Sequence, residues 1–195
     1  MIIPDPNVHS AGFFALVCYV PEPLGPALDQ LRKALPGIDF PEAHITLLPP
    51  RPLQGPLEEA SAHALDVLRG FSAFDVELGS VHRFTETNTL YLDLAEGNDQ
   101  IHQLHNDLAT GQLHYLEEFE FHPHLTVGGP ILPLTASEIQ GRAEDVWRSL
   151  SVSRRFTINE VVALWAEAAE GALQWQRLWT FSFELGAARG ATASP

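Results

Sequence analysis

Short apolar runs bounded by turn-forming residues alternate along the chain with longer segments in which leucine and alanine recur every three or four positions. The apolar or alternating runs predict strands, and the segments with helical spacing predict helices. Helices are predicted over residues 24–35, 57–68, 101–108 and 135–150. Strands are predicted over residues 13–20, 43–48, 74–78, 89–94, 119–127, 156–159, 161–165 and 175–183. This mixture indicates an α+β protein.

The predicted elements fall into two similar series, each running strand, helix, strand, helix, strand. Two landmarks recur at nearly equal offsets along the chain. His44 and His124 lie 80 positions apart, and Phe74 and Phe156, which open the last strand of each series, lie 82 positions apart. Such an internal repeat predicts two lobes of similar topology, packed about a pseudo-two-fold axis.

Two of the predicted strands carry the same pattern of polar and apolar residues. One contains His44-Ile45-Thr46-Leu47 and ends at two prolines, and the other contains His124-Leu125-Thr126-Val127 and ends at Gly128-Gly129-Pro130. Side chains alternate between the two faces of a strand, so the histidine and threonine of each motif share one face. His122 is on that face too. If the lobes pack with these strands adjacent, two histidines and two threonines meet in one cleft.

A pair of facing histidines suits a reaction that needs a base and an acid together. The unperturbed pKa of imidazole is near 6.5, so at neutral pH one ring can accept a proton while the other donates one. Attack on a phosphodiester needs these groups on opposite sides of phosphorus. Each threonine lies about 6–7 Å along the strand from its histidine, where its hydroxyl could donate to a phosphate oxygen. A single His-x-Thr segment is usually structural, but two matched copies favour a function.

Length and charge restrict the class of protein. The 195 residues carry 25 acidic and 11 basic side chains, a formal net charge of −14 that argues against a surface coating DNA or RNA. A small phosphorylated substrate remains compatible with this charge. We expect one bilobal domain over residues 1–185 and a disordered tail over residues 186–195, where small and turn-forming residues dominate.

The single cysteine, Cys18, excludes an intramolecular disulfide and fits a reducing compartment. The apolar run around it, residues 13–20, is too short to span a membrane. No positively charged segment precedes it, as a secretory signal would require. We therefore expect a cytoplasmic protein without a membrane partner.

At the two His-x-Thr motifs the sequence resembles the two-histidine (2H) phosphoesterase superfamily, and within it the bacterial 2′-5′ RNA ligase / RNA 2′,3′-cyclic phosphodiesterase family. The resemblance runs from about residue 12 to residue 185. It implies a bilobal α+β fold in which antiparallel sheets line a central cleft and helices lie outside. It also implies metal-independent opening of 2′,3′-cyclic or 2′-5′ phosphodiesters, with ligation as the possible reverse reaction, and no cofactor.

The resemblance assigns acid–base roles to His44 and His124, and phosphate-binding roles to Thr46 and Thr126. Which histidine is the base stays open. Relatives often have a basic residue soon after the second motif, and here none follows it. Together with the acidic charge, this favours a small nucleotide or RNA end as substrate. A monomer is assumed.

Further candidates to contact a substrate are Arg51, His122 and Tyr91. Arg51 follows the first motif and is either a substitute for the missing basic residue or a solvated loop arginine. His122 either lines the cleft or marks the start of its strand. Tyr91 is the preferred aromatic residue to stack on a base.

Two other functions remain compatible with the sequence. In a metal-dependent hydrolase, His122, His124 and His44 would supply three imidazoles to a zinc ion. In a non-catalytic nucleotide-binding module, the same cleft would hold a phosphorylated ligand without turnover.

Overall fold

The computed structural model describes residues 12–36, 42–169 and 172–183. Its strands form a single eight-stranded antiparallel sheet in the order β6-β3-β4-β5-β2-β1-β7-β8. The strands are β1 (Phe13–Tyr19), β2 (His44–Pro52), β3 (Phe74–Arg83), β4 (Leu90–Glu96), β5 (Leu125–Gly128), β6 (Arg155–Ile158), β7 (Glu160–Ala169) and β8 (Ala172–Ser182). The helices are α1 (Leu24–Lys33), α2 (Leu57–Leu68), α3 (Asn98–Leu108), the short 3-10 helix η1 (Gly111–Leu113) and α4 (Ala136–Ser149).

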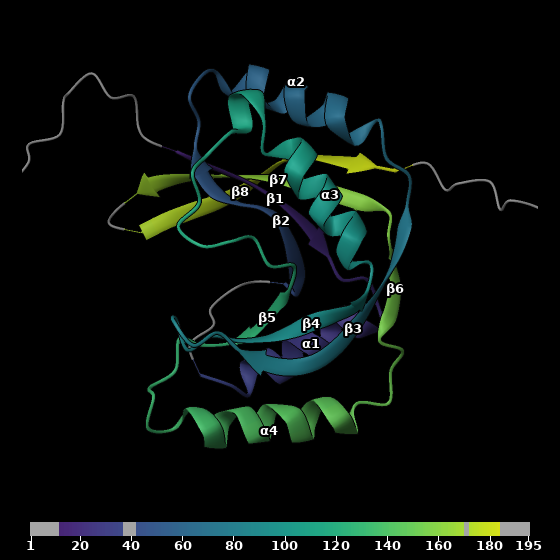
Figure 1. Ribbon diagram of the computed structural model, residues 1–195, viewed down its shortest axis with the longest axis vertical. Coiled ribbons are helices and arrows are strands. Elements are labelled where there is room, and N and C mark those ends of the chain that lie inside the picture. The colour runs from purple at the N-terminus through teal and green to yellow at the C-terminus, as the bar shows by residue number, and fades with distance from the viewer. Residues whose placement is uncertain (1–11, 37–41, 170–171, 184–195) are drawn as a thin grey trace, which may run out of the picture.

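The sheet curls into two halves that face each other across an open side (Figure 1). The halves join where β2 meets β5, and at this junction Ile45 pairs with Leu125. Helices α2 and α3 lie outside the half formed by β2, β1, β7 and β8, and helices α1 and α4 lie outside the other half. This is the predicted α+β fold, with helices outside and an antiparallel sheet curving around a central cleft.

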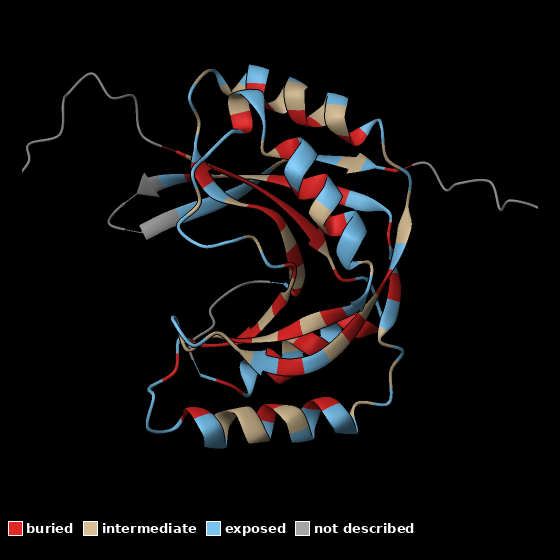
Figure 2. Ribbon diagram, in the orientation of Figure 1, coloured by how far each residue is buried: buried red, intermediate tan, exposed pale blue. Residues whose placement is uncertain are grey.

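The core lies between the sheet and these outer helices, where buried residues concentrate in Figure 2. Five consecutive residues of β1, Phe14 to Cys18, are buried, since helices cover one face of this central strand and the curled sheet encloses the other. Helix α1 buries Leu24, Leu28 and Leu31, whose spacing places them on one face. Apolar periodicity in the sequence therefore reports which face of each element points into the core.

The internal repeat is present, but one of its two landmarks is wrong. Strands β3 and β6 lie side by side, with Val76 opposite Phe156, so the strands opened by Phe74 and Phe156 belong to the same half. About the junction of β5 and β2, the sheet order instead matches β4 with β1 and β3 with β7. Strand β3 of the first series and its counterpart β7 in the second therefore each lie in the half opposite to the other strands of their series. Local periodicity identifies a strand but not the strand it pairs with.

The predicted helices agree with the structure to within three residues at each end, whereas the second motif strand is shorter than predicted. Residues 119–124 are irregular, and β5 begins only at Leu125. Its end is fixed by Gly129, which has φ +106° and whose added Cβ would lie 2.8 Å from the Asn88 carbonyl oxygen. The tail predicted over residues 186–195 lies outside the described residues. None of the helices described has the length and apolar character needed to cross a membrane.

Candidate functional site

The two His-x-Thr segments have the same local structure. From Glu42 to Leu48 and from His122 to Gly128, exposed, buried and half-buried residues follow one another in the same order. In the first, His44 Nδ1 lies 2.7 Å from the Glu42 carbonyl oxygen, and in the second, His124 Nδ1 lies 2.6 Å from the His122 carbonyl oxygen. A carbonyl only accepts, so Nδ1 carries the proton in each ring. A neutral ring then has its basic lone pair on Nε2.

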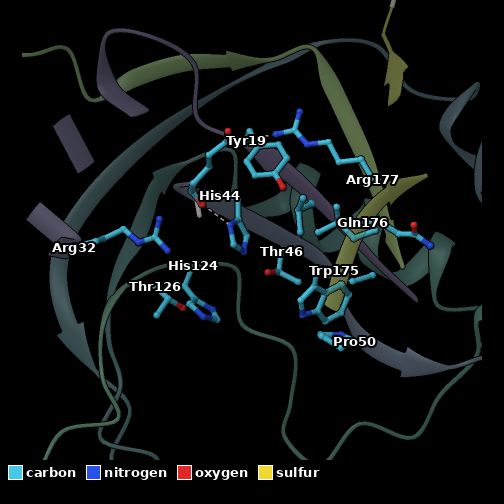
Figure 3. A pocket seen from close by; sticks show the side chains of 14 residues that line it. Tyr19, Arg32, His44, Thr46, Pro50, His124, Thr126, Trp175, Gln176 and Arg177 are labelled. Atoms are coloured by element: carbon cyan, nitrogen blue, oxygen red, sulfur yellow. Dashed lines mark hydrogen bonds and ion pairs between the residues drawn. The ribbon is translucent and has the colours of Figure 1, made fainter. Parts of the chain in front are cut away.

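All four motif side chains line one cavity of about 620 Å³ (Figure 3). His44 and Thr46 come from β2, while Thr126 comes from β5 and His124 directly precedes that strand. The remaining lining residues come from β1, α1, the segment just before β2, β2 itself, β7 and β8. They are Ala15, Val17, Tyr19, Arg32, Glu42, Pro50, Leu164, Trp175, Gln176 and Arg177. The structure therefore brings together the four residues that the sequence predicted to converge.

A second cavity of about 790 Å³ adjoins the first and shares Thr46, Pro50 and His124 with it. The loop between η1 and β5 forms much of its wall. The other lining residues are Pro49, Phe84, Glu86, Thr87, Thr89, Tyr115, Leu116, Glu117, Glu118, Phe119, Glu120, Phe121 and His122. The motif residues thus stand at the junction of two compartments, an arrangement that could hold the two sides of a phosphodiester.

Burial is the main influence on the protonation of both motif histidines. Desolvation lowers the pKa of His44 and of His124 below the usual 6.5, while the hydrogen bond from each Nδ1 to its carbonyl opposes this. The charge of His44 also lowers the pKa of His124. Both rings are therefore predominantly neutral in the free protein at neutral pH, and an anionic ligand between them would favour protonation of one.

Two arginines line the first cavity that the sequence analysis did not identify. Arg32 on α1 is 4% exposed and forms an ion pair with Asp29, 2.9 Å away. Arg177 on β8 pairs with Glu42, and its Cζ lies 4.5 Å from the centre of the Tyr19 ring. No local motif marks either residue, because Arg32 lies on a helix and Arg177 far along the chain. The packing of α1 against β5 brings Arg32 near the histidines, and the pairing of β2, β1, β7 and β8 brings Arg177 near them.

Arg51 is not among the described residues that line either cavity, although it contacts two that line the second. Its side chain is 1% exposed and is held by three acceptors: Nε donates to the Pro49 carbonyl oxygen (3.1 Å), Nη1 to the Leu113 carbonyl oxygen (2.8 Å), and Nη2 to the Glu117 carboxylate. Arg51 is thus neither a solvated loop arginine nor placed to contact a ligand in these cavities. It ties the end of β2 to the loop that walls the second cavity.

His122 and Tyr91 belong to an aromatic cluster beside the second cavity. His122 is exposed and lines that cavity. The ring of Tyr91 is stacked on Phe84, with centroids 4.0 Å apart, and meets the rings of His122 and His124 edge-on. Phe84 lines the second cavity, and Tyr91 is not among the described lining residues of either cavity. Phe84 is therefore better placed than Tyr91 to contact a ligand.

The three-imidazole zinc site has no geometric support. In the ranges that the structure describes, no three His, Cys, Asp or Glu side chains are grouped closely enough to hold a metal ion. The ring centroids of His122 and His124 are 6.3 Å apart.

Comparison with known proteins gives a family match and a shared fold. Residues 20–170 match the family model described as the 2′-5′ RNA ligase superfamily. The crystal structure of Escherichia coli LigT complexed with NADP+ is similar at a TM-score of 0.59 and 13% identity, covering 90% of this chain and 99% of that one. The protein TT0787 of Thermus thermophilus is similar at a TM-score of 0.59 and 15% identity, covering 90% and 100%. No curated protein sequence matches the chain.

Proposed function

The chain belongs to the 2′-5′ RNA ligase superfamily, and on this premise we propose that it is a phosphodiesterase that opens 2′,3′-cyclic phosphodiesters of a nucleotide or RNA end. Family membership supports an enzyme of the phosphoesterase kind. One observation carries the finer proposal: His44 and His124, each with Nδ1 bonded to the carbonyl two residues earlier, line one cavity together with both motif threonines.

In the proposed reaction one imidazole acts as base and the other as acid. The neutral ring accepts a proton at Nε2 from the attacking water as the water oxygen bonds to phosphorus. The P–O bond to the ribose 3′ oxygen breaks, and the protonated ring donates its Nε2 proton to that oxygen. The products are a 2′-phosphate and a 3′-hydroxyl. If a ribose 5′-hydroxyl replaced water as the attacking group, the same bond would break and a 2′-5′ linkage would form.

The backbone hydrogen bond at each Nδ1 prepares the ring for this role. It holds the ring in one orientation and keeps the reactive lone pair or proton on Nε2. The hydroxyls of Thr46 and Thr126 are proposed to donate to the non-bridging phosphate oxygens, where negative charge develops in the transition state. Because two imidazoles supply both proton transfers, the scheme needs no metal ion or other cofactor.

A nucleotide-sized substrate is supported by the site and by what related structures contain. LigT has been crystallised with NADP+, 3′-AMP and ATP. The first cavity, of about 620 Å³, is within the range of cavities that bind small molecules. We propose a small nucleotide or RNA end as substrate and, from the single cysteine, a reducing compartment such as the cytoplasm.

The test is hydrolysis of a nucleoside 2′,3′-cyclic phosphate in excess EDTA by the parent protein, His44→Ala and His124→Ala. His114→Ala is the matched control, because His114 is exposed and is not among the described residues that line the cavities. We expect chelator-resistant turnover to a 2′-phosphate in the parent and control, and a loss of at least about 100-fold in each motif variant. Turnover abolished by EDTA would indicate a metal-dependent hydrolase. Stoichiometric binding without turnover would indicate a nucleotide-binding module.

A further inference from the structure

The two cavities that meet at the motif residues differ in the charged side chains that line them. The first is lined by two arginines, Arg32 and Arg177, and by one carboxylate, that of Glu42. In Figure 3 the two arginines approach the cavity from different sides, with His44 between them. On a chain with a formal net charge of −14, such a basic compartment is unusual. Although Arg32 is paired with Asp29 and Arg177 with Glu42, the two guanidinium groups offer an anion N–H donors in this cavity.

The second cavity is acidic. Glu86, Glu117, Glu118 and Glu120 line it, and no arginine or lysine is among the lining residues in the part of the chain that is described. Glu117 has Arg51 as its buried partner, whereas Glu86, Glu118 and Glu120 are exposed residues. A phosphate placed in this compartment would meet several carboxylates without a compensating cation. The carboxylates and a phosphate are all negatively charged and repel one another, so phosphate binding in the second cavity is disfavoured.

Arg177 is held where it could bind a second phosphate of a substrate. The Tyr19 ring lies between it and the motif: the ring centroids of Tyr19 and His44 are 5.8 Å apart, and Arg177 Cζ is 4.5 Å from the Tyr19 centroid. The Arg177 guanidinium is therefore separated from His44 by one aromatic ring, so a substrate whose reacting phosphate lies at His44 could present a second phosphate to Arg177. Glu42 accepts from Nη2, and a guanidinium has five N–H donors, so the ion pair orients Arg177 without using all of its donors.

We propose that this charge difference fixes the orientation of the substrate: the nucleoside lies in the first cavity with a 5′-phosphate on Arg177, and the attacking group, which approaches from the second cavity, carries no phosphate. This inference rests on the proposed function and narrows it. The substrate class becomes a cyclic nucleotide with a 5′-phosphate, or an RNA end whose chain leaves through the first cavity. Water is then favoured over a polynucleotide 5′-hydroxyl as the attacking group, because the polynucleotide would bring its phosphates against Glu118 and Glu120.

The test compares two substrates that differ in one group, a nucleoside 2′,3′-cyclic phosphate with a 5′-hydroxyl and the same molecule with a 5′-phosphate. The ratio of their kcat/KM values is measured for the parent, Arg177→Gln and the double variant Glu118→Gln/Glu120→Gln. Arg155→Gln is the matched control, since Arg155 also lies on a strand, is half-exposed and is paired with glutamates, but is not among the described cavity-lining residues.

We expect the parent and the Arg155 variant to prefer the 5′-phosphorylated substrate by about tenfold, the scale of one charge-assisted phosphate contact. Arg177→Gln should bring the ratio close to one, and the double glutamine variant should leave it unchanged. Equal kcat/KM values in the parent would overturn the proposal. The proposal would also be overturned if the parent preferred the substrate with the 5′-hydroxyl and Glu118→Gln/Glu120→Gln removed that preference, because the nucleoside would then occupy the second cavity.

If the protein turns over neither substrate, that result contradicts the proposed reaction but leaves the proposed orientation open to a binding test. In that case, the affinities for a nucleoside 2′,5′-bisphosphate and a nucleoside 2′-phosphate, measured by calorimetry, test the same preference. If the parent binds the bisphosphate about tenfold more tightly and Arg177→Gln removes that difference, the orientation is supported. Equal affinities for the two ligands in the parent would refute it.

Discussion

Replacement of Arg51 by alanine should destabilise the fold far more than replacement of a surface arginine. The guanidinium is buried, and its removal would leave the Glu117 carboxylate without its cation and the carbonyl oxygens of Pro49 and Leu113 without their donor. Burial lowers the pKa of Arg51, and Glu117 acts in the opposite direction, so the pair depends on both partners. Breaking a buried ion pair by removing one partner costs about 3–5 kcal/mol.

The matched control is Arg69→Ala. Arg69 forms an ion pair with Asp66 one helical turn earlier, but both side chains are largely exposed, at 64% and 77%. Exposed pairs of this kind contribute about 0–1 kcal/mol. Urea unfolding followed by tryptophan fluorescence should therefore give a free energy of unfolding lower by about 3–5 kcal/mol for Arg51→Ala and by less than about 1 kcal/mol for Arg69→Ala, with similar m-values.

The same experiment separates a structural role for Arg51 from a substrate-binding one. If Arg51→Ala unfolds at the same urea concentration as Arg69→Ala but has lost turnover of the cyclic substrate, the structural reasoning is refuted. Arg51 would then have to reach the substrate, as its position after the first motif suggested.

Three further predictions concern the site. Thr46→Val and Thr126→Val, which keep side-chain shape but remove the hydroxyl, should each lower kcat by about 100-fold with little change in KM, measured under saturating substrate. Because burial lowers the pKa of both His44 and His124, kcat/KM should peak below pH 6.5 and fall as the acid loses its proton at higher pH; NMR titration of the two rings in the free protein should place both pKa values below 6.5. Burial also lowers the pKa of His105, so the unfolded chain binds more protons below pH 6.5, and the free energy of unfolding should fall as pH decreases from 6.5; His105→Gln should reduce that dependence.

The catalytic candidates could be predicted from sequence because their signal is local. A strand places residues two positions apart on one face, so the motif itself implies that His44 and Thr46 share a face. The repeat then implies that His124 and Thr126 do the same. Neither conclusion depends on which strands pair in the sheet. The structure agrees, even though His124 lies just before β5 and not within it.

Arg177 and the buried state of Arg51 could not be predicted because they depend on long-range contacts. Arg177 lies on β8, whose partner β7 pairs in turn with β1 and so reaches the first motif. Arg51 is buried because Leu113 and Glu117, more than 60 positions later, pack against it. Charge and hydropathy alone place both arginines on the surface. The wrong correspondence of Phe74 with Phe156 has the same origin, since strand pairing is not encoded in periodicity.

The two motifs share the same backbone hydrogen bond, but different side chains surround them. One such difference is at the position two residues before each histidine. At that position Glu42 and His122 both supply the carbonyl that accepts from Nδ1. Their side chains then act in opposite directions. The Glu42 carboxylate raises the pKa of His44, whereas the charge of His122 lowers the pKa of His124.

The same two side chains belong to the two cavities. Glu42 orients Arg177 in the basic compartment, and His122 packs on the aromatic cluster beside the acidic one. Arg32 lowers the pKa of His44, whereas Asp29, its ion-pair partner, and Glu42 both raise it. In the orientation proposed above, the ribose lies in the first cavity, which His44 lines, so we expect His44 to be the acid that serves the leaving oxygen. His124 lines both cavities, so we expect it to be the base that activates water entering from the acidic one.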